Sequence, residues 1–310
     1  MAVPTETVYG LAADARQPEA VAGIFAAKRR PTSHPLIVHV ADVDQVAAWA
    51  RAVPQAVRLL ADAFWPGALT VLLAKSAEVS PGVTGGLGSV AVRVPSHPAL
   101  RDLLQRVQTG LAAPSANPYR ELSPTCASHV LAKLGGRIDA VLDGGACTLG
   151  IESTIVDLTG ARPTIVRPGP VSVAAIETVL GMPVSTADPS AGVPGGEAVH
   201  YQPSAPAFMV TPTELESAIE ATRRAGLRAG VLLIEGREAA GATPCQRLRL
   251  ADDPQDYGAG LYAALHELDG LGIDRILVQS PPDDHGWEPV HNRLQRACMP
   301  WPPGGHSPLR

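Results

Sequence analysis

The chain of 310 residues has few aromatic residues and few cysteines. Phe, Trp and Tyr make up 4% of it, so its cores must be built from Ala, Val, Leu and Ile. Its four cysteines are far apart and form no C-x-x-C pair, which excludes a zinc knuckle or a disulfide framework and suits a reducing compartment. No stretch approaches the roughly 18 apolar residues of a membrane helix, and the first residues do not resemble a signal peptide. We therefore expect a cytoplasmic protein without a membrane partner.

Positive charge is also scarce. The formal net charge is −5, and charged residues make up 18% of the chain. A general nucleic-acid coat needs a basic face, and this composition argues against one. The composition does not exclude a local basic pocket.

Apolar runs of strand length recur along the first half, at 36–40, 69–74, 90–94, 139–143, 153–158 and 164–168. Between several of them lie segments with helical spacing, such as 18–30 and 96–107. Strands that alternate with helices predict an α/β domain. The last two runs are separated by a short turn and predict a hairpin, so we expect a mixed, twisted sheet.

Composition predicts where the domains divide. Residues 181–206 are rich in Pro, Gly, Ser and Ala and predict a linker, which at this length is either disordered or a functional lid. The predicted boundaries are therefore 1–180 for the first domain, 207–304 for a smaller three-layer α/β domain, and 305–310 for a frayed tail.

Three consecutive cations, Lys28, Arg29 and Arg30, precede the buried run "PLIVHV". The favourable interaction of cations with a helix C-terminus explains Lys28 and Arg29 without any ligand. It explains less well why His39 stands inside an apolar strand, with His34 just before it. A lone buried histidine is more often a core residue than a ligand, but near three cations it becomes a functional candidate.

The segment "GLAAPSANPYRELSPT" at 110–125 combines small residues with Ser115, Asn117 and Ser123. Small residues let a ligand approach the backbone, and hydroxyl, amide and N–H groups bind phosphate. The segment does not match a P-loop. An ordinary corner in which Ser123 caps a helix is an equally good interpretation.

Two arginines, Arg93 and Arg167, interrupt apolar strands, and Ser153 lies on the strand next to Arg167. A buried arginine normally has an anionic partner. One such arginine could form an internal salt bridge. Two buried arginines, together with Lys28 and Arg30, favour a cavity for a multiply charged anion.

The loop "PTETVYGL" offers the hydroxyls of Thr5, Thr7 and Tyr9, and alone it predicts only a polar loop.

No Ser-His-Asp order and no metal-ligand spacing is visible. We therefore expect no covalent intermediate and no metal bound by protein side chains. The chemistry should be positioning and charge neutralisation, as for transfer at phosphorus.

In this order, "PTETVYGL", "KRRPTSHPLIVHV", "FWPGALTVLL", "VAVRVP", "APSAN" and "GIESTIVDL…IVRPG" resemble the Sua5/YrdC/YciO family. The segment "AVHYQPSAP" is similar to the interdomain linker of its long, Sua5-type members, and the C-terminal half to their Sua5 domain. The resemblance implies a YrdC-like catalytic domain at 1–180 and a Rossmann-like Sua5 domain at 207–304.

The family resemblance implies an L-threonylcarbamoyladenylate synthase, a nucleotidyltransferase. It makes L-threonylcarbamoyl-AMP from L-threonine, bicarbonate or CO2, and ATP, and releases pyrophosphate. The product serves t6A37 modification of tRNA through downstream transferase proteins, so we expect no strong tRNA binding. Mg2+ would arrive with ATP, and no organic cofactor is implied.

By the same resemblance, the site residues fall into two groups. The groups implied to bind and activate ATP are Lys28, Arg30, His34, Ser89, Ser115, Asn117, Ser123, Arg167 and, from the linker, Tyr201. Lys28, Arg30, Ser115 and Asn117 are the catalytic candidates among them. The residues implied to bind L-threonine are Thr7, His39, Arg93, Ala113 and Ser153.

The sequence departs from the family pattern at three places. His34 stands where Asn is common and Ser89 where Thr is common, and both replacements can still donate hydrogen bonds. Only three residues precede "PTETVYGL", so we expect the true start to lie upstream. Two alternatives remain: a carbamoyltransferase that adenylates carbamoyl phosphate, and a non-enzymatic RNA-binding module, which the acidic balance disfavours.

Overall fold

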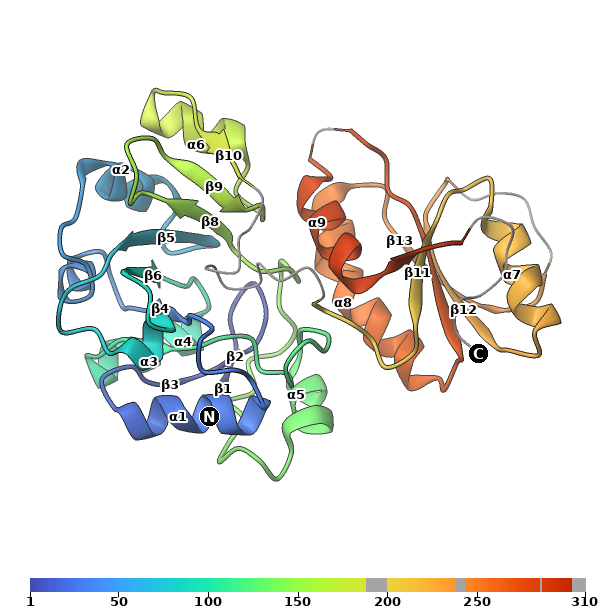
Figure 1. The fold of residues 1–310 in the computed structure, drawn as a ribbon, viewed down its shortest axis with the longest axis horizontal. Coiled ribbons are helices and arrows are strands. Elements are labelled where there is room, and N and C mark those ends of the chain that lie inside the picture. The colour runs from blue at the N-terminus through green and yellow to red at the C-terminus, as the bar shows by residue number, and fades with distance from the viewer. Residues whose placement is uncertain (188–199, 238–242, 285, 303–310) are drawn as a thin grey trace. The chain divides into compact units, whose positions relative to one another are not determined.

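The computed structural model describes residues 1–187, 200–237, 243–284 and 286–302. The chain divides into two compact units (Figure 1). The first comprises Met1–Tyr119 and Ser123–Glu197, and the second Arg120–Leu122 and Ala198–Arg310. Part of the predicted linker and the whole predicted tail lie outside the described residues. The domain boundaries drawn from the sequence stay a prediction.

Short strands and helices alternate through the first unit. Its strands are β1 (Ala2–Val3), β2 (Gly10–Leu11), β3 (Ala13–Asp14), β4 (Ile37–His39), β5 (Leu69–Ala74), β6 (Ser89–Arg93), β7 (Leu111–Ala112), β8 (Thr154–Asp157), β9 (Thr164–Arg167) and β10 (Ser185–Thr186). Its helices are α1 (Pro18–Lys28), the short 3-10 helix η1 (Asp44–Ala48), α2 (Gln55–Phe64), α3 (Pro81–Thr84), α4 (Pro98–Val107), α5 (Ala127–Leu134) and α6 (Val173–Leu180).

The large sheet of this unit has the strand order β10-β9-β8-β5-β6-β4-β7-β3 among the described residues. Neighbouring strands run parallel at β4–β6, β5–β8 and β9–β10 and antiparallel elsewhere. The predicted hairpin is the antiparallel pair β8–β9. The expectation of a mixed sheet is therefore confirmed.

The two faces of this sheet have different surroundings. Val38, Val71, Val92 and Val156 belong to the main core, which also contains apolar residues of α1, α2 and α6. The alternate residues form a second, smaller cluster on the other face, made of Ile37, Leu72, Ala91, Ile155 and Val166. Because side chains alternate along a strand, His39, Thr70 and Arg93 share this second face.

The second unit is a three-layer α/β domain. Its strands are β11 (Ala207–Val210), β12 (Ala229–Ile234), β13 (Gln246–Leu250), β14 (Arg275–Gln279) and β15 (Met299–Pro300), and its helices are α7 (Leu215–Arg224), α8 (Pro254–Gly270) and α9 (Glu288–Ala297). The strands form an all-parallel sheet in the order β13-β12-β14-β11-β15. Helix α7 covers one face and α8 with α9 the other (Figure 1). The predicted Rossmann-like layering is confirmed.

One local prediction is wrong. Residues 139–143 form only an isolated bridge between Val141 and Ala2, and three of the five are exposed, so they do not make a buried strand. Within the predicted linker, Ser185 and Thr186 form the short strand β10, which pairs with β9. Among the described residues, no helix is both long and apolar enough to cross a bilayer.

Candidate functional site

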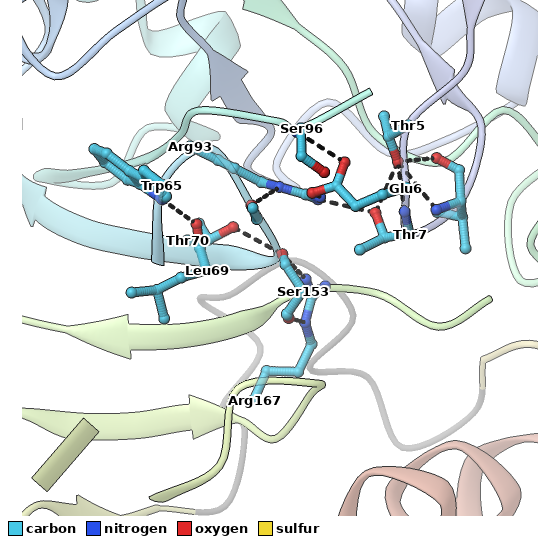
Figure 2. Close-up of polar contacts among 12 residues, drawn as sticks. Thr5, Glu6, Thr7, Trp65, Leu69, Thr70, Arg93, Ser96, Ser153 and Arg167 are labelled. Atoms are coloured by element: carbon cyan, nitrogen blue, oxygen red, sulfur yellow. Dashed lines mark hydrogen bonds and ion pairs between the residues drawn. The ribbon is translucent and has the colours of Figure 1, made fainter. Parts of the chain in front are cut away.

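Several strands of the large sheet begin or end at the same edge. Strands β4 and β6 run parallel, and their last residues, His39 and Arg93, are paired. Strand β5 is antiparallel to β6 and begins beside its end, and β8 begins beside β5. Strand β9 returns antiparallel and ends at Arg167. The topology therefore gathers Thr70, Arg93, Ser153 and Arg167 at one edge (Figure 2). His39 joins them there through its pairing with Arg93.

The guanidinium of Arg93 is buried and held on three sides. Its Nε donates to the carbonyl oxygen of Gly67 at 3.0 Å, and one terminal nitrogen donates to Thr7 Oγ1 at 2.9 Å. The other terminal nitrogen forms an ion pair with Glu6 (Figure 2). A guanidinium has five N–H donors, so two of them have no partner among the described residues. They can receive a carboxylate.

Glu6 fixes the position of Arg93 from the other side. Its second carboxylate oxygen accepts from the backbone N–H of Ser96 at 3.1 Å. Burial alone would raise the pKa of Glu6, but the charge and hydrogen bond of Arg93 and the Ser96 N–H outweigh burial and lower the pKa. Glu6 therefore stays ionised. The Glu6–Arg93 pair is thus an internal salt bridge, one possibility that the sequence allowed for a single buried arginine.

The loop that carries Glu6 is buried, whereas its sequence alone predicted only a polar loop. Thr5 Oγ1 accepts from the backbone N–H groups of Thr7 at 3.0 Å and Val8 at 3.1 Å. The hydroxyls of Thr5 and Thr7 are 2.8 Å apart. Thr7 is 1% exposed. These bonds hold the Thr7 hydroxyl against Arg93.

Ser153 and Arg167 are in direct contact at the same edge. Arg167 Nε donates to the Ser153 carbonyl oxygen at 3.0 Å, and a terminal nitrogen of Arg167 donates to Ser153 Oγ at 3.1 Å. Thr70 Oγ1 lies 2.8 Å from Ser153 Oγ (Figure 2). The structure thus joins a residue expected to bind ATP to one expected to bind threonine.

His39 is neutral in this position. Burial, and next the positive charge of Arg93, lower the pKa of its imidazole to about 3. Its Nδ1 has no hydrogen-bond partner in the part of the chain that the structure describes. A neutral, buried ring nitrogen beside Arg93 can bind a polar group of a ligand.

Lys28, the last residue of α1, is not a solvated cation. It is 1% exposed, and its Nζ donates to the carbonyl oxygens of Ser115, at 2.5 Å, and of Asn117. Arg29 adopts a left-handed conformation and is exposed. Arg30 is buried again and donates to the Pro35 carbonyl oxygen at 3.3 Å. Lys28 therefore does not belong to a solvated helix C-terminus, and its ammonium instead fixes the small-residue segment.

That segment is tied to the strands around it. Ser115 forms a bridge with Gly10, and Ala113 donates its N–H to the Ile37 carbonyl oxygen at 2.9 Å. The Asn117 side chain donates to the Pro118 carbonyl oxygen at 3.0 Å.

Ser123 does not cap a helix, which was one interpretation of its position. Helix α5 begins at Ala127, with Cys126 as its N-cap residue. Ser123 is fully buried, and its hydroxyl donates to Glu152 at 2.6 Å. Because Glu152 precedes Ser153, this bond connects Ser123 to the sheet edge.

The remaining candidates are His34, Ser89 and Tyr201. The His34 ring packs edge-to-face on Tyr119, with 5.4 Å between centroids. Ser89 begins β6 and is thus at the opposite end of that strand from Arg93. Tyr201 belongs to the second unit, where it is 1% exposed and packs against Tyr262. Its contribution to the site in the first unit stays a prediction.

Three residues of the site were not predicted from the sequence: Glu6, Thr70 and Glu152. Each is a buried polar residue within one of the segments that carry the family resemblance. For Thr70 the available signal was the one that singled out Arg93, a polar side chain inside an otherwise apolar strand, whereas Glu6 and Glu152 lie in polar segments that gave no such signal.

The chain matches two family models. Residues 1–169 match Sua5_yciO_yrdC, described as "Telomere recombination", and residues 171–298 match Sua5_C, described as "Threonylcarbamoyl-AMP synthase, C-terminal domain". A threonylcarbamoyl-AMP synthase of Bacillus subtilis is 38% identical over 96% of this chain and 89% of its own length. One of Pyrococcus abyssi is 36% identical over the same shares.

A solved structure has the same fold over nearly the whole chain. The crystal structure of P. abyssi Sua5 complexed with L-threonine has a TM-score of 0.87 and 36% identity, and the match covers 96% of this chain and 89% of that one. The two family models, the relatives and the fold all indicate the same family, and the chain belongs to the Sua5/YciO/YrdC family.

Proposed function

We propose that this protein synthesises L-threonylcarbamoyl-AMP from L-threonine, bicarbonate or CO2, and ATP, with release of pyrophosphate, for t6A37 modification of tRNA. The observation that carries the proposal is the sheet edge where Arg93 retains two N–H donors beside Thr7 and where Ser153 contacts Thr70 and Arg167. Relatives named threonylcarbamoyl-AMP synthase, aligned over 96% of the chain, support it.

L-Threonine would bind at this edge. The two remaining N–H groups of Arg93 suit a bidentate bond to its carboxylate. The Thr7 hydroxyl and the neutral ring of His39 lie next to Arg93 and would contact its amino or hydroxyl group. Ser153 and the backbone at Ala113 would complete the pocket.

The ATP phosphates would meet the cations of the basic motif. Lys28 and Arg30 would neutralise the charge of the departing pyrophosphate, while Ser115 and Asn117 would contact the phosphates from the segment that Lys28 holds. Arg167, through its contact with Ser153, would bridge nucleotide and amino acid. His34, Ser89 and Ser123 would add hydrogen bonds, and Tyr201 would close over the site.

The reaction needs two bond-forming steps. The threonine amine takes up CO2 to form a carbamate, with loss of a proton. A carbamate oxygen then attacks the α-phosphorus of ATP, and the bond to the β-phosphate oxygen breaks. Holding both substrates at one sheet edge turns this attack into an intramolecular step, which is the main rate gain that positioning supplies.

Mg2+ would come with ATP rather than from a protein site. Among the described residues, no group of three or more His, Cys, Asp or Glu is placed to hold a metal ion. When bound, Mg2+ would neutralise charge on the phosphate oxygens. We propose that the reaction needs no organic cofactor. Because the net charge of −5 argues against strong tRNA binding, we propose that the product passes to a downstream t6A transferase.

The test is pyrophosphate release with ATP and Mg2+, with L-threonine or bicarbonate left out in turn. We expect release only when both are present, and a product with the mass of threonylcarbamoyl-AMP. Equal release without L-threonine would overturn the proposal. Turnover of carbamoyl phosphate in place of threonine and bicarbonate would favour the carbamoyltransferase alternative.

A further inference from the structure

Thr70 is a buried hydroxyl inside an otherwise apolar strand. Strand β5 reads Leu-Thr-Val-Leu-Leu-Ala, and Thr70 is 0% exposed. Valine has nearly the same shape and suits strands equally well. A hydroxyl at such a place needs a partner, because its burial is otherwise unfavourable. Among the described residues that partner is Ser153, 2.8 Å away.

The direction of this hydrogen bond follows from counting donors and acceptors. A hydroxyl has one hydrogen and two lone pairs, and Ser153 Oγ already accepts from Arg167. If Ser153 donated to Thr70, the Thr70 hydrogen would remain inside the strand with no acceptor among the described residues, which is costly. Ser153 instead precedes β8, at the edge where a ligand would bind. Thr70 therefore donates, and Ser153 accepts twice.

With both lone pairs of Ser153 filled, its own hydrogen must point away from Thr70 and Arg167. We propose that Thr70 is a positioning residue that orients the Ser153 hydroxyl as a donor to an oxyanion of the amino-acid substrate. This inference rests on the proposed function, which supplies two such oxyanions, the carboxylate and the carbamate. The guanidinium of Arg167 strengthens the donor, because hydrogen bonds in a chain polarise one another.

The experiment compares four variants of the full chain: Thr70→Val, Thr70→Ser, Ser153→Ala and the double variant Thr70→Val/Ser153→Ala. Calorimetry measures L-threonine binding alone, and pyrophosphate release gives KM values for threonine, bicarbonate and ATP. Thr70→Val keeps the shape and removes the donor, so we expect threonine affinity or bicarbonate KM to worsen about 3- to 10-fold. Thr70→Ser keeps the donor and should behave like wild type.

A double-mutant cycle separates positioning from a structural role. If Thr70 acts through Ser153, the double variant should be no worse than Ser153→Ala, and the ATP KM should change less than about twofold. Weaker binding of threonine alone assigns the acceptor as the carboxylate; a change confined to the bicarbonate KM assigns it as the carbamate. Additive losses, a Thr70→Ser variant as impaired as Thr70→Val, or no change in any of these measurements would overturn the inference.

The wild type, measured in parallel, distinguishes failure of this inference from failure of the proposed function. Wild type that releases no threonine-dependent pyrophosphate contradicts the function, and the calorimetry still tests the Ser153 donor. Wild type that does not bind L-threonine at all contradicts both.

Discussion

Glu6→Gln removes one charge from a buried ion pair and preserves the shape of the side chain. Glu6 is 7% exposed and Arg93 is 3% exposed, so solvent cannot replace the lost carboxylate. Removal of one partner of such a pair costs about 3–5 kcal/mol. The amide can still accept one of the two hydrogen bonds, so we expect the lower end, about 3 kcal/mol, in the free energy of unfolding at pH 7.

The loss should depend on pH in a defined direction. Because the pKa of Glu6 is lowered from its ordinary value of 4.5, its contribution is fully present above that value. It disappears as the pH falls through the lower folded-state pKa, where the wild-type carboxylate takes up a proton. We therefore expect the stability gap between wild type and Glu6→Gln to be full at pH 7 and to narrow below about pH 4.

The assay is hydrogen exchange in urea, measured on peptides of β4, β5 and β6, so that the transition belongs to the first unit. Glu6→Gln/Arg93→Met serves as the matched control, because removal of both charges should recover part of the loss. A Glu6→Gln protein as stable as wild type at pH 7 would refute the reasoning. So would a gap that stays constant down to pH 3.

Three further outcomes are expected. Lys28→Ala should lower threonine-dependent pyrophosphate release at least about 100-fold, while Arg29→Ala, the exposed neighbour, should stay within about twofold of wild type; equal rates in the two would contradict the assignment. The pKa of His39 is about 3 in the folded protein and about 6.5 in the unfolded chain, so as the pH falls the unfolded state takes up a proton that the folded state does not. From pH 7 to pH 5, wild type should therefore lose about 2 kcal/mol more stability than His39→Gln in denaturant titrations. Gly169→Ala should cost about 1–3 kcal/mol by thermal unfolding, because its Cβ would lie 2.4 Å from the Thr154 backbone nitrogen; an unchanged Tm would contradict this.

Much of the fold could be predicted because the strongest sequence signals coincide with well-buried elements. The run at 69–74 became β5, and the runs at 153–158 and 164–168 became the β8–β9 hairpin. The run at 139–143 failed because its apolar residues are too few and its position too exposed to be held in a sheet. The two residues of β10 were missed because they are exposed, and pairing with β9 alone defines them.

The candidate site was predicted by residue type and by resemblance, but its internal bonds were not. A buried Arg93 indicated an anion, yet the sequence could not decide between a ligand and Glu6, and the structure adds Glu6 while leaving two donors unused. Lys28 was ambiguous because its burial depends on the distant Ser115 segment. Such contacts join residues about 90 positions apart, and local patterns carry no information on them.

The order of strands in the large sheet also bears on how the protein is made. Leu69 of β5 pairs with Thr154 of β8, about 85 residues later in the chain. At roughly 5–20 residues per second, a ribosome needs about 4–17 s to cover that distance. During this interval β8 cannot yet pair with β5, so one side of this strongly apolar central strand lacks its final neighbour until β8 emerges.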